Sequence, residues 1–261
     1  MTLTRRSALV TGSTSGIGLA IARALAREGA NVMINGFGDA EEIAALCRDL
    51  AAEFGVEVDY DGADLSDPAA AAALVRTTQA RFGSLDILVN NAGIQFVAPI
   101  EEFPAARWDA IIAINLSSVF HTMSAAIPSM KARGWGRIIN VASAHGLVAS
   151  PFKVAYVAAK HGVVGATKVA AIELANDGVT VNAICPGWVL TPLVERQLQD
   201  RARDAGTDVL TESGLMLAEK QPMHRFTSPE SIGAMAVFLC SEAASTITGA
   251  PLSIDGGWVA Q

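Results

Sequence analysis

Short apolar runs alternate with longer stretches of helical periodicity along most of the chain. Runs of valine, isoleucine and leucine with few polar positions predict strands that are buried on both faces. The predicted strands lie at residues 7–10, 31–35, 56–60, 85–89, 137–141, 179–183 and 252–254. The predicted helices lie at about 16–29, 39–54, 67–82, 105–132, 154–176 and 228–239. Strands that alternate with helices predict an α/β fold, a Rossmann-type doubly wound parallel sheet, because parallel neighbours need right-handed crossovers.

The alternation weakens at residues 188–226. This segment mixes charged residues with Gly206 and Gly214 and contains no clear strand. A long excursion after a strand of such a sheet often covers an active site. We therefore expect residues 188–226 to form a helical, substrate-binding lid.

Composition narrows the class of protein. A chain of 261 residues suits one domain, residues 1–261, and 51% hydrophobic against 17% charged residues argues against disorder. The net charge of -7 and the lack of a basic patch disfavour nucleic acid as a partner. The uncharged stretch 110–130 contains Asn115 and Pro128, so it predicts a core helix rather than a membrane span. The three cysteines lack metal-site spacing. We expect a cytoplasmic protein with no membrane association and no metal.

A glycine-rich loop joins the first predicted strand to the first helix. It reads Thr11-Gly12-Ser13-Thr14-Ser15-Gly16-Ile17-Gly18. Gly12 allows a tight turn, while Gly16 and Gly18 let a ligand approach the backbone. The start of the following helix then offers free N–H groups and a partial positive charge to a pyrophosphate. The loop and its context predict a dinucleotide site.

Four further motifs follow in order. They are Asn90-Asn91-Ala92-Gly93, Ser143, the pair Tyr156 and Lys160, and Pro186-Gly187. Together with the glycine loop they resemble the short-chain dehydrogenase/reductase family over nearly the whole chain. The resemblance implies about seven strands in the order 3-2-1-4-5-6-7 and a homotetramer.

Tyr156 and Lys160 are four positions apart on a predicted helix, which puts them on one face about one turn apart. A free phenol has a pKa of about 10, and lowering it to about 7 takes about 4 kcal/mol. A nearby ammonium and a cationic nicotinamide ring are suitable sources. Tyr156 would then act as the catalytic acid/base. The resemblance implies that Ser143 bonds the reacting oxygen, that Lys160 also holds the nicotinamide ribose, and that Asn115 supports a proton relay.

The cofactor prediction is NAD. Selection of NADP needs a cation near the ribose phosphate, and neither residues 13–15 nor residues 35–39 contain one. The acid common in NAD-using relatives is displaced here to Asp39. The expected cofactor-binding residues are Gly12, Thr14, Ser15, Gly16, Ile17, Gly18, Phe37, Asp64, Leu65, Asn91, Ala92, Gly93, Tyr156, Lys160, Pro186, Gly187, Val189 and Thr191.

A second set of residues concerns the substrate. Gln95, His145, Lys153, Trp188 and Gln197 resemble the set of the bacterial D-3-hydroxybutyrate dehydrogenases, a subgroup of this family. A carboxylate removed from water needs charge-assisted donors. Lys153 would supply the cation, His145 and the two glutamines neutral donors, and Trp188 an apolar wall. The resemblance implies a small anionic hydroxy or keto acid, and oxidation of D-3-hydroxybutyrate to acetoacetate.

Three alternatives remain at this stage. Another enzyme of the family, such as a 3-oxoacyl-carrier-protein reductase, usually needs NADPH and a basic surface, and the loops here show neither. A non-catalytic dinucleotide sensor would keep the glycine loop but would not need Tyr156, Lys160 and Ser143 together. A purely structural oligomer would have no use for these three residues.

Overall fold

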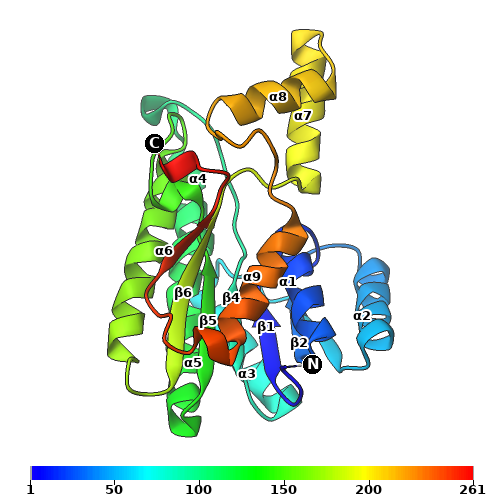
Figure 1. Cartoon of the computed structure of the whole chain (residues 1–261), viewed down its shortest axis with the longest axis vertical. Coiled ribbons are helices and arrows are strands. Elements are labelled where there is room, and N and C mark those ends of the chain that lie inside the picture. Colours follow the sequence, from blue (N-terminus) through cyan, green and yellow to red (C-terminus); the bar gives the residue numbers. More distant parts are fainter. Residues whose placement is uncertain (1, 261) are drawn as a thin grey trace.

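The computed structural model describes residues 2–260 and contains one parallel sheet with the strand order β3-β2-β1-β4-β5-β6-β7 (Figure 1). This is the predicted Rossmann-type topology. The observed strands overlap all the predicted ones: β1 and β2 have the predicted bounds, and the bounds of the others differ by at most three residues. The strands are β1 (Ser7–Val10), β2 (Asn31–Asn35), β3 (Val58–Asp61), β4 (Ile87–Asn90), β5 (Gly136–Val141), β6 (Val179–Pro186) and β7 (Pro251–Ile254).

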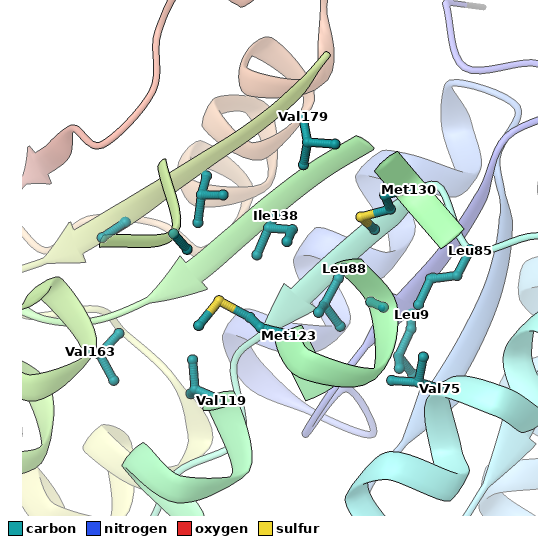
Figure 2. Packing of buried hydrophobic residues seen from close by; sticks show 14 of the residues in the cluster. Leu9, Val75, Leu85, Leu88, Val119, Met123, Met130, Ile138, Val163 and Val179 are labelled. Carbon is teal, nitrogen blue, oxygen red and sulfur yellow. The ribbon is translucent and has the colours of Figure 1, made fainter. Parts of the chain in front are cut away.

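Helices cover both faces of the sheet. One buried cluster joins the sheet to α1, α2 and α9, and the other joins it to α3, α5 and α6. Figure 2 shows the second cluster, where Val119 and Met123 of α5 pack over Leu88 and Ile138 of the sheet. The helices are α1 (Gly16–Arg27), α2 (Ala40–Phe54), α3 (Pro68–Phe82), α4 (Ala105–Ile112), α5 (Ser118–Arg133), α6 (Val154–Glu173), α7 (Pro192–Ala205), α8 (Val209–Ala218) and α9 (Pro229–Cys240).

Side-chain caps fix where several helices begin. Asp39 accepts hydrogen bonds from two backbone N–H groups at the start of α2, and Asp67 does the same for one at the start of α3. Proline follows the capping residue in α3, α7 and α9, where its missing N–H costs nothing. These caps fix the residue at which each of these helices begins.

The long predicted helix 105–132 is interrupted. A π-helical turn, Ala113–Ser117, separates α4 from α5. The whole run Ala105–Arg133 has the length and apolar character of a membrane span, but only 39% of its apolar window is buried in the described chain. The prediction of a core helix is therefore correct for one face only, since Met123 is buried whereas Phe120 is 61% exposed.

Residues 188–226 form two helices, α7 and α8, above the carboxyl edge of the sheet (Figure 1). The two ends of the segment are joined to each other, because Val189 and Thr227 form a parallel β-bridge. The backbone N–H of Thr227 also donates to the carbonyl of Trp188 at 2.9 Å. The helices thus rise from a base in which the two ends of the segment are paired just beyond the end of β6.

Candidate active site

A cavity of about 480 Å³ lies at the carboxyl edge of the sheet, between the strand ends and α7. Ligands bind at this edge in open α/β sheets. The cavity is lined by residues from the glycine loop, the ends of β4, β5 and β6, helix α6 and the segment predicted to be a lid. Of the predicted site residues, all except Asn115 line the cavity. Side chains spread over more than 180 positions of the chain, from Gly12 to Gln197, therefore share one site.

The glycine loop has the close packing that a dinucleotide loop needs. Gly12 has a φ of +61°, and a Cβ there would lie 2.8 Å from the Cα of Ala92. A Cβ on Gly18 would lie 2.3 Å from the carbonyl oxygen of Gly12. Ser15 begins α1 without a side-chain cap, so the first N–H groups of the helix remain available to an anion.

Tyr156 is held at the sheet end of the cavity by α6, on the same helical face as Lys160. Burial raises the pKa of Tyr156, and a hydrogen bond with Ser143 opposes that shift. The lowering of the pKa of Tyr156 by the Lys160 ammonium together with a cationic nicotinamide ring stays a prediction. The ammonium lies 5.6 Å from the centroid of the phenol ring, and its Nζ donates to the carbonyl of Val141 at 2.7 Å. Desolvation of the phenolate is the largest influence on the pKa of Tyr156.

Lys160 is itself almost completely buried, with 4% exposure. Burial lowers its pKa to about 8. A buried ammonium is costly unless it is hydrogen-bonded, and the structure shows one protein acceptor for three donor hydrogens. The remaining donors are available for hydroxyl groups of a ligand.

Asn115 lies behind the cavity rather than in its wall. Its side-chain oxygen accepts from the N–H of Ile94 at 2.9 Å, and its amide nitrogen donates to the carbonyl of the same residue at 2.9 Å. The π-helical turn that contains Asn115 thereby ties the helix to the loop after β4. A proton relay through Asn115 stays a prediction.

The substrate end of the cavity contains aromatic side chains and the half-buried ammonium of Lys153. Lys153 Nζ lies 5.2 Å from the centroid of the Trp188 ring, and burial lowers its pKa. Burial and the charge of Lys153 lower the pKa of His145 to about 4, so this histidine is neutral at pH 7. Its Nε2 lies 2.9 Å from the hydroxyl oxygen of Ser150. Gln95 and Gln197 complete the predicted set from the loop after β4 and from α7.

Trp258 and Arg196 are among the cavity residues that were not predicted. Trp258 is 6% exposed and stacks at 5.0 Å from His145 and at 5.7 Å from Trp188, measured between ring centroids. It lies just after β7, in a short turn with no sequence pattern of its own. Arg196, next to Gln197 on α7, adds a further cation to the lining of the cavity.

The opposite end of the cavity, formed by the ends of β2 and β3, contains no cation among its described residues. Asn35, Gly36, Phe37, Asp64 and Leu65 line it. Phe37 is 68% exposed, and its carbonyl accepts a hydrogen bond from Thr14 at 3.0 Å. Asp39 is engaged as the cap of α2. Asp64 accepts a hydrogen bond from the N–H of Ser66, which lowers its pKa. Within residues 2–260 no cluster of metal-ligating side chains is found.

Comparison with known proteins places this architecture in a family. A family model described as enoyl-(acyl carrier protein) reductase matches residues 12–259. The chain belongs to the short-chain dehydrogenase/reductase family. It is 60% identical over 259 residues to a D-beta-hydroxybutyrate dehydrogenase of Cupriavidus necator, covering 99% of this chain and 100% of that protein. It is 54% identical to a D-beta-hydroxybutyrate dehydrogenase of Rhizobium meliloti, over 98% of this chain and 99% of that one.

A solved structure agrees with these similarities. The L-sorbose reductase of Gluconobacter frateurii, complexed with NADPH and L-sorbose, superimposes with a TM-score of 0.94 at 32% identity and full coverage of both chains. The predicted fold is therefore confirmed, and so is an oxidoreductase of the CH-OH class with a nicotinamide dinucleotide as cofactor.

Proposed function

We propose that the protein oxidises D-3-hydroxybutyrate to acetoacetate by reversible hydride transfer. The observation that carries this proposal is that one cavity contains both the residues for proton transfer and the residues for binding a carboxylate. Tyr156, Ser143 and Lys160 stand at its base, and a cation with neutral donors faces them at the substrate end. The 60% and 54% identity to D-beta-hydroxybutyrate dehydrogenases supports the same substrate.

Tyr156 is the proton acceptor in this proposal. Its hydroxyl group and that of Ser143 are hydrogen-bonded, so an alcohol oxygen held by both would lose its proton to Tyr156. Bound NAD would take the hydride and contribute a positive charge that favours the phenolate. Lys160 has free donor hydrogens for the ribose hydroxyls of the cofactor.

The carboxylate of the substrate would lie among Lys153, His145, Gln95 and Gln197. His145 is neutral at pH 7, so it contributes a hydrogen bond and Lys153 contributes the charge. Trp188 and Trp258 form an apolar wall that limits the length of the carbon chain. A site in which Lys153, neutral donors and two indole rings surround the substrate is matched to a short acid.

We propose NAD as the cofactor. Its binding residues would be the glycine loop, Phe37, Asp64 and Leu65 at the adenosine end, and residues 91–93, 186–187, Val189 and Thr191 around the nicotinamide. The described residues at the adenosine end offer no cation for a 2′-phosphate. NADPH in the sorbose reductase structure belongs to that enzyme.

The test is an assay of pure protein with each enantiomer of 3-hydroxybutyrate and with NAD or NADP, followed by the absorbance of reduced cofactor. We expect turnover of the D enantiomer with NAD, at a specificity constant at least about tenfold above that with NADP. Absence of turnover with both enantiomers would reject the substrate. Reduction of an acetoacetyl thioester with NADPH alone would favour a carrier-protein reductase instead.

We further propose that the chain is a single domain, residues 1–261, with residues 188–226 as the lid, and that it acts as a cytoplasmic homotetramer in ketone-body metabolism. Exposed apolar side chains on neighbouring helices support assembly. They are Phe120 on α5 and Val169 and Ile172 on α6. A lone surface phenylalanine is ordinary, but a group on two adjacent helices is typical of an interface.

A further inference from the structure

A buried amide, Gln221, connects three segments around the substrate pocket without lining the cavity itself. These segments are the exit of β6, the end of the lid and the C-terminal turn. We infer that Gln221 is a positioning residue that fixes the wall formed by Trp188 and Trp258 and so sets the size of substrate that the site accepts. This inference rests on the proposed function.

The first contact is with the exit of β6. The Gln221 side chain is 1% exposed, and its Oε1 accepts a hydrogen bond from the backbone N–H of Trp188 at 2.9 Å. A Cβ on the preceding residue, Gly187, would lie 2.7 Å from the same oxygen. The glycine therefore lets the amide approach the strand, and the amide holds the backbone from which the Trp188 ring projects.

The second contact is with the end of the lid. The Nε2 of Gln221 donates to the carbonyl of Arg225 at 2.6 Å and lies 3.4 Å from that of Met223. The amide thus uses its acceptor and its donors at once, as a buried amide must. Residues 221–225 are thereby folded back onto residue 188, next to the β-bridge of Val189 and Thr227.

The third contact is with the C-terminal turn that carries Trp258. A Cβ on Gly256 would lie 2.7 Å from Nε2 of Gln221, so this backbone also rests directly on the amide. The carbonyl of Gly256 accepts from the N–H of Met223 at 2.9 Å. Asp255 then fixes the turn, because its carboxylate accepts from the N–H groups of Gly257 and Val259.

Gln221 therefore controls the relative position of two indole rings that come from distant parts of the chain. Their centroids are 5.7 Å apart, Trp258 packs on His145, and Trp188 carries the ammonium of Lys153 over its face. A shift of either backbone would widen the pocket and displace two carboxylate ligands. Catalytic Tyr156 and the glycine loop are attached to other elements and would keep their places.

The test compares Gln221→Met with a matched control, Gln199→Met, at an exposed position of α7 that does not line the cavity. Methionine keeps the length of the side chain and removes its hydrogen bonds. For Gln221→Met we expect KM for D-3-hydroxybutyrate to rise about tenfold or more, with kcat and NAD affinity changed less than about threefold. The preference in kcat/KM for D-3-hydroxybutyrate over D-3-hydroxyhexanoate should fall about tenfold. Gln199→Met should leave all four quantities unchanged.

Gln221→Asn guards against a variant that fails to fold. It keeps a neutral amide but is one methylene shorter, so it cannot reach both the N–H of Trp188 and the carbonyl of Arg225 and should show the same rise in KM. Equal losses in kcat, NAD affinity and KM, together with a lower Tm, would mean a merely structural role and overturn the inference. Wild-type KM and size preference in either folded variant would also overturn it. If the unmodified protein does not oxidise 3-hydroxybutyrate, the proposed function fails first.

Discussion

Burial, rather than ion pairing, sets the charge states of the side chains around the cavity. It raises the pKa of Tyr156 and lowers those of Lys160, Lys153 and His145. Each shift favours the neutral form of the group, as expected where burial dominates, and the charge of Glu219 opposes the shift of Lys153 without reversing it. Because water is largely excluded from the cavity, its effective dielectric is low, and the interactions of a bound anion or a cationic cofactor with the protein are strong there.

Tyr156→Phe tests the proton acceptor. The ring would still pack, so the fold and NAD binding should persist, while oxidation of 3-hydroxybutyrate should fall at least about 100-fold, as for loss of a general base. Steady-state kinetics and NAD titration measure the two effects separately. A variant that retains more than about a tenth of the wild-type rate would exclude Tyr156 as the acid/base.

Lys153→Ala tests recognition of the carboxylate. Loss of the cation should reduce kcat/KM for 3-hydroxybutyrate by more than the roughly 10- to 150-fold typical of one charged hydrogen bond. A neutral alcohol of similar size should be affected much less. Equal losses on both substrates would show that Lys153 does not bind the carboxylate, and the assignment as an oxidoreductase would still stand.

His145 makes the stability of the protein depend on pH. Its pKa is about 4 in the folded chain and about 6.5 in the unfolded chain, so between these values the unfolded state binds more protons. The stability contributed by neutral His145 is therefore complete above about pH 6.5 and is lost as the pH falls toward 4. The shift corresponds to roughly 3 kcal/mol.

Urea unfolding from pH 4 to 7 measures this effect against His145→Gln, which has no titratable group at this position. The difference in unfolding free energy between the two proteins should shrink by roughly 3 kcal/mol as the pH is lowered. A difference that is constant with pH would show that His145 is not held neutral by burial.

At the scale of elements, we expect the proposed lid to divide into a fixed base and a part that moves. The β-bridge between Val189 and Thr227 and the contacts of Gln221 hold the two ends of the segment. Helices α7 and α8 project beyond this base (Figure 1). We expect closure over cofactor and substrate to involve residues 192–218 rather than the whole of residues 188–226.

Hydrogen exchange measures that division. With NAD and a non-reacting substrate analogue, amides of α7 and α8 should exchange more slowly than in the free protein, while those of the paired base should be protected in both states. Uniform exchange over residues 188–226 would contradict a fixed base.

Gln197→Ala tests whether closure of the proposed lid adds a hydrogen bond to the substrate carboxylate. Gln197 lies on α7, so its contact with the carboxylate depends on the closed lid. Its loss should reduce kcat/KM for 3-hydroxybutyrate by roughly 10- to 150-fold and leave NAD affinity nearly unchanged. An equal loss on a neutral alcohol of the same size would assign Gln197 to lid closure in general rather than to the carboxylate.

The elements also show where sequence reasoning ends. Strands β1 and β2 follow directly from their apolar runs, because burial on both faces leaves a local pattern. The π-helical turn at Ala113–Ser117 leaves none, since it depends on Asn115 reaching the loop at Ile94. Trp258 and Gln221 were missed for the same reason: their roles arise from contacts between segments far apart in the chain.

At the scale of the whole molecule, three of the large apolar side chains exposed in the described residues lie on α5 and α6. The run Ala105–Arg133 is apolar enough for a membrane span, yet one face packs on α3 and the sheet, which leaves the other face with Phe120 exposed. Val169 and Ile172 are exposed on α6. A second copy of the chain is the partner that a proposed homotetramer would supply for this surface.

Phe120→Asp tests that surface. In a symmetric interface the aspartate would meet its own counterpart or an apolar side chain, so a desolvated charge should separate the subunits. We expect light scattering after size-exclusion chromatography to show a tetramer for the unmodified protein and a smaller species for the variant. Leu210→Asp is the matched control, because Leu210 is 83% exposed on α8, away from α5 and α6, and should leave the assembly intact. A variant that stays tetrameric would exclude the α5 surface as an interface, whereas a monomeric unmodified protein would reject the homotetramer itself.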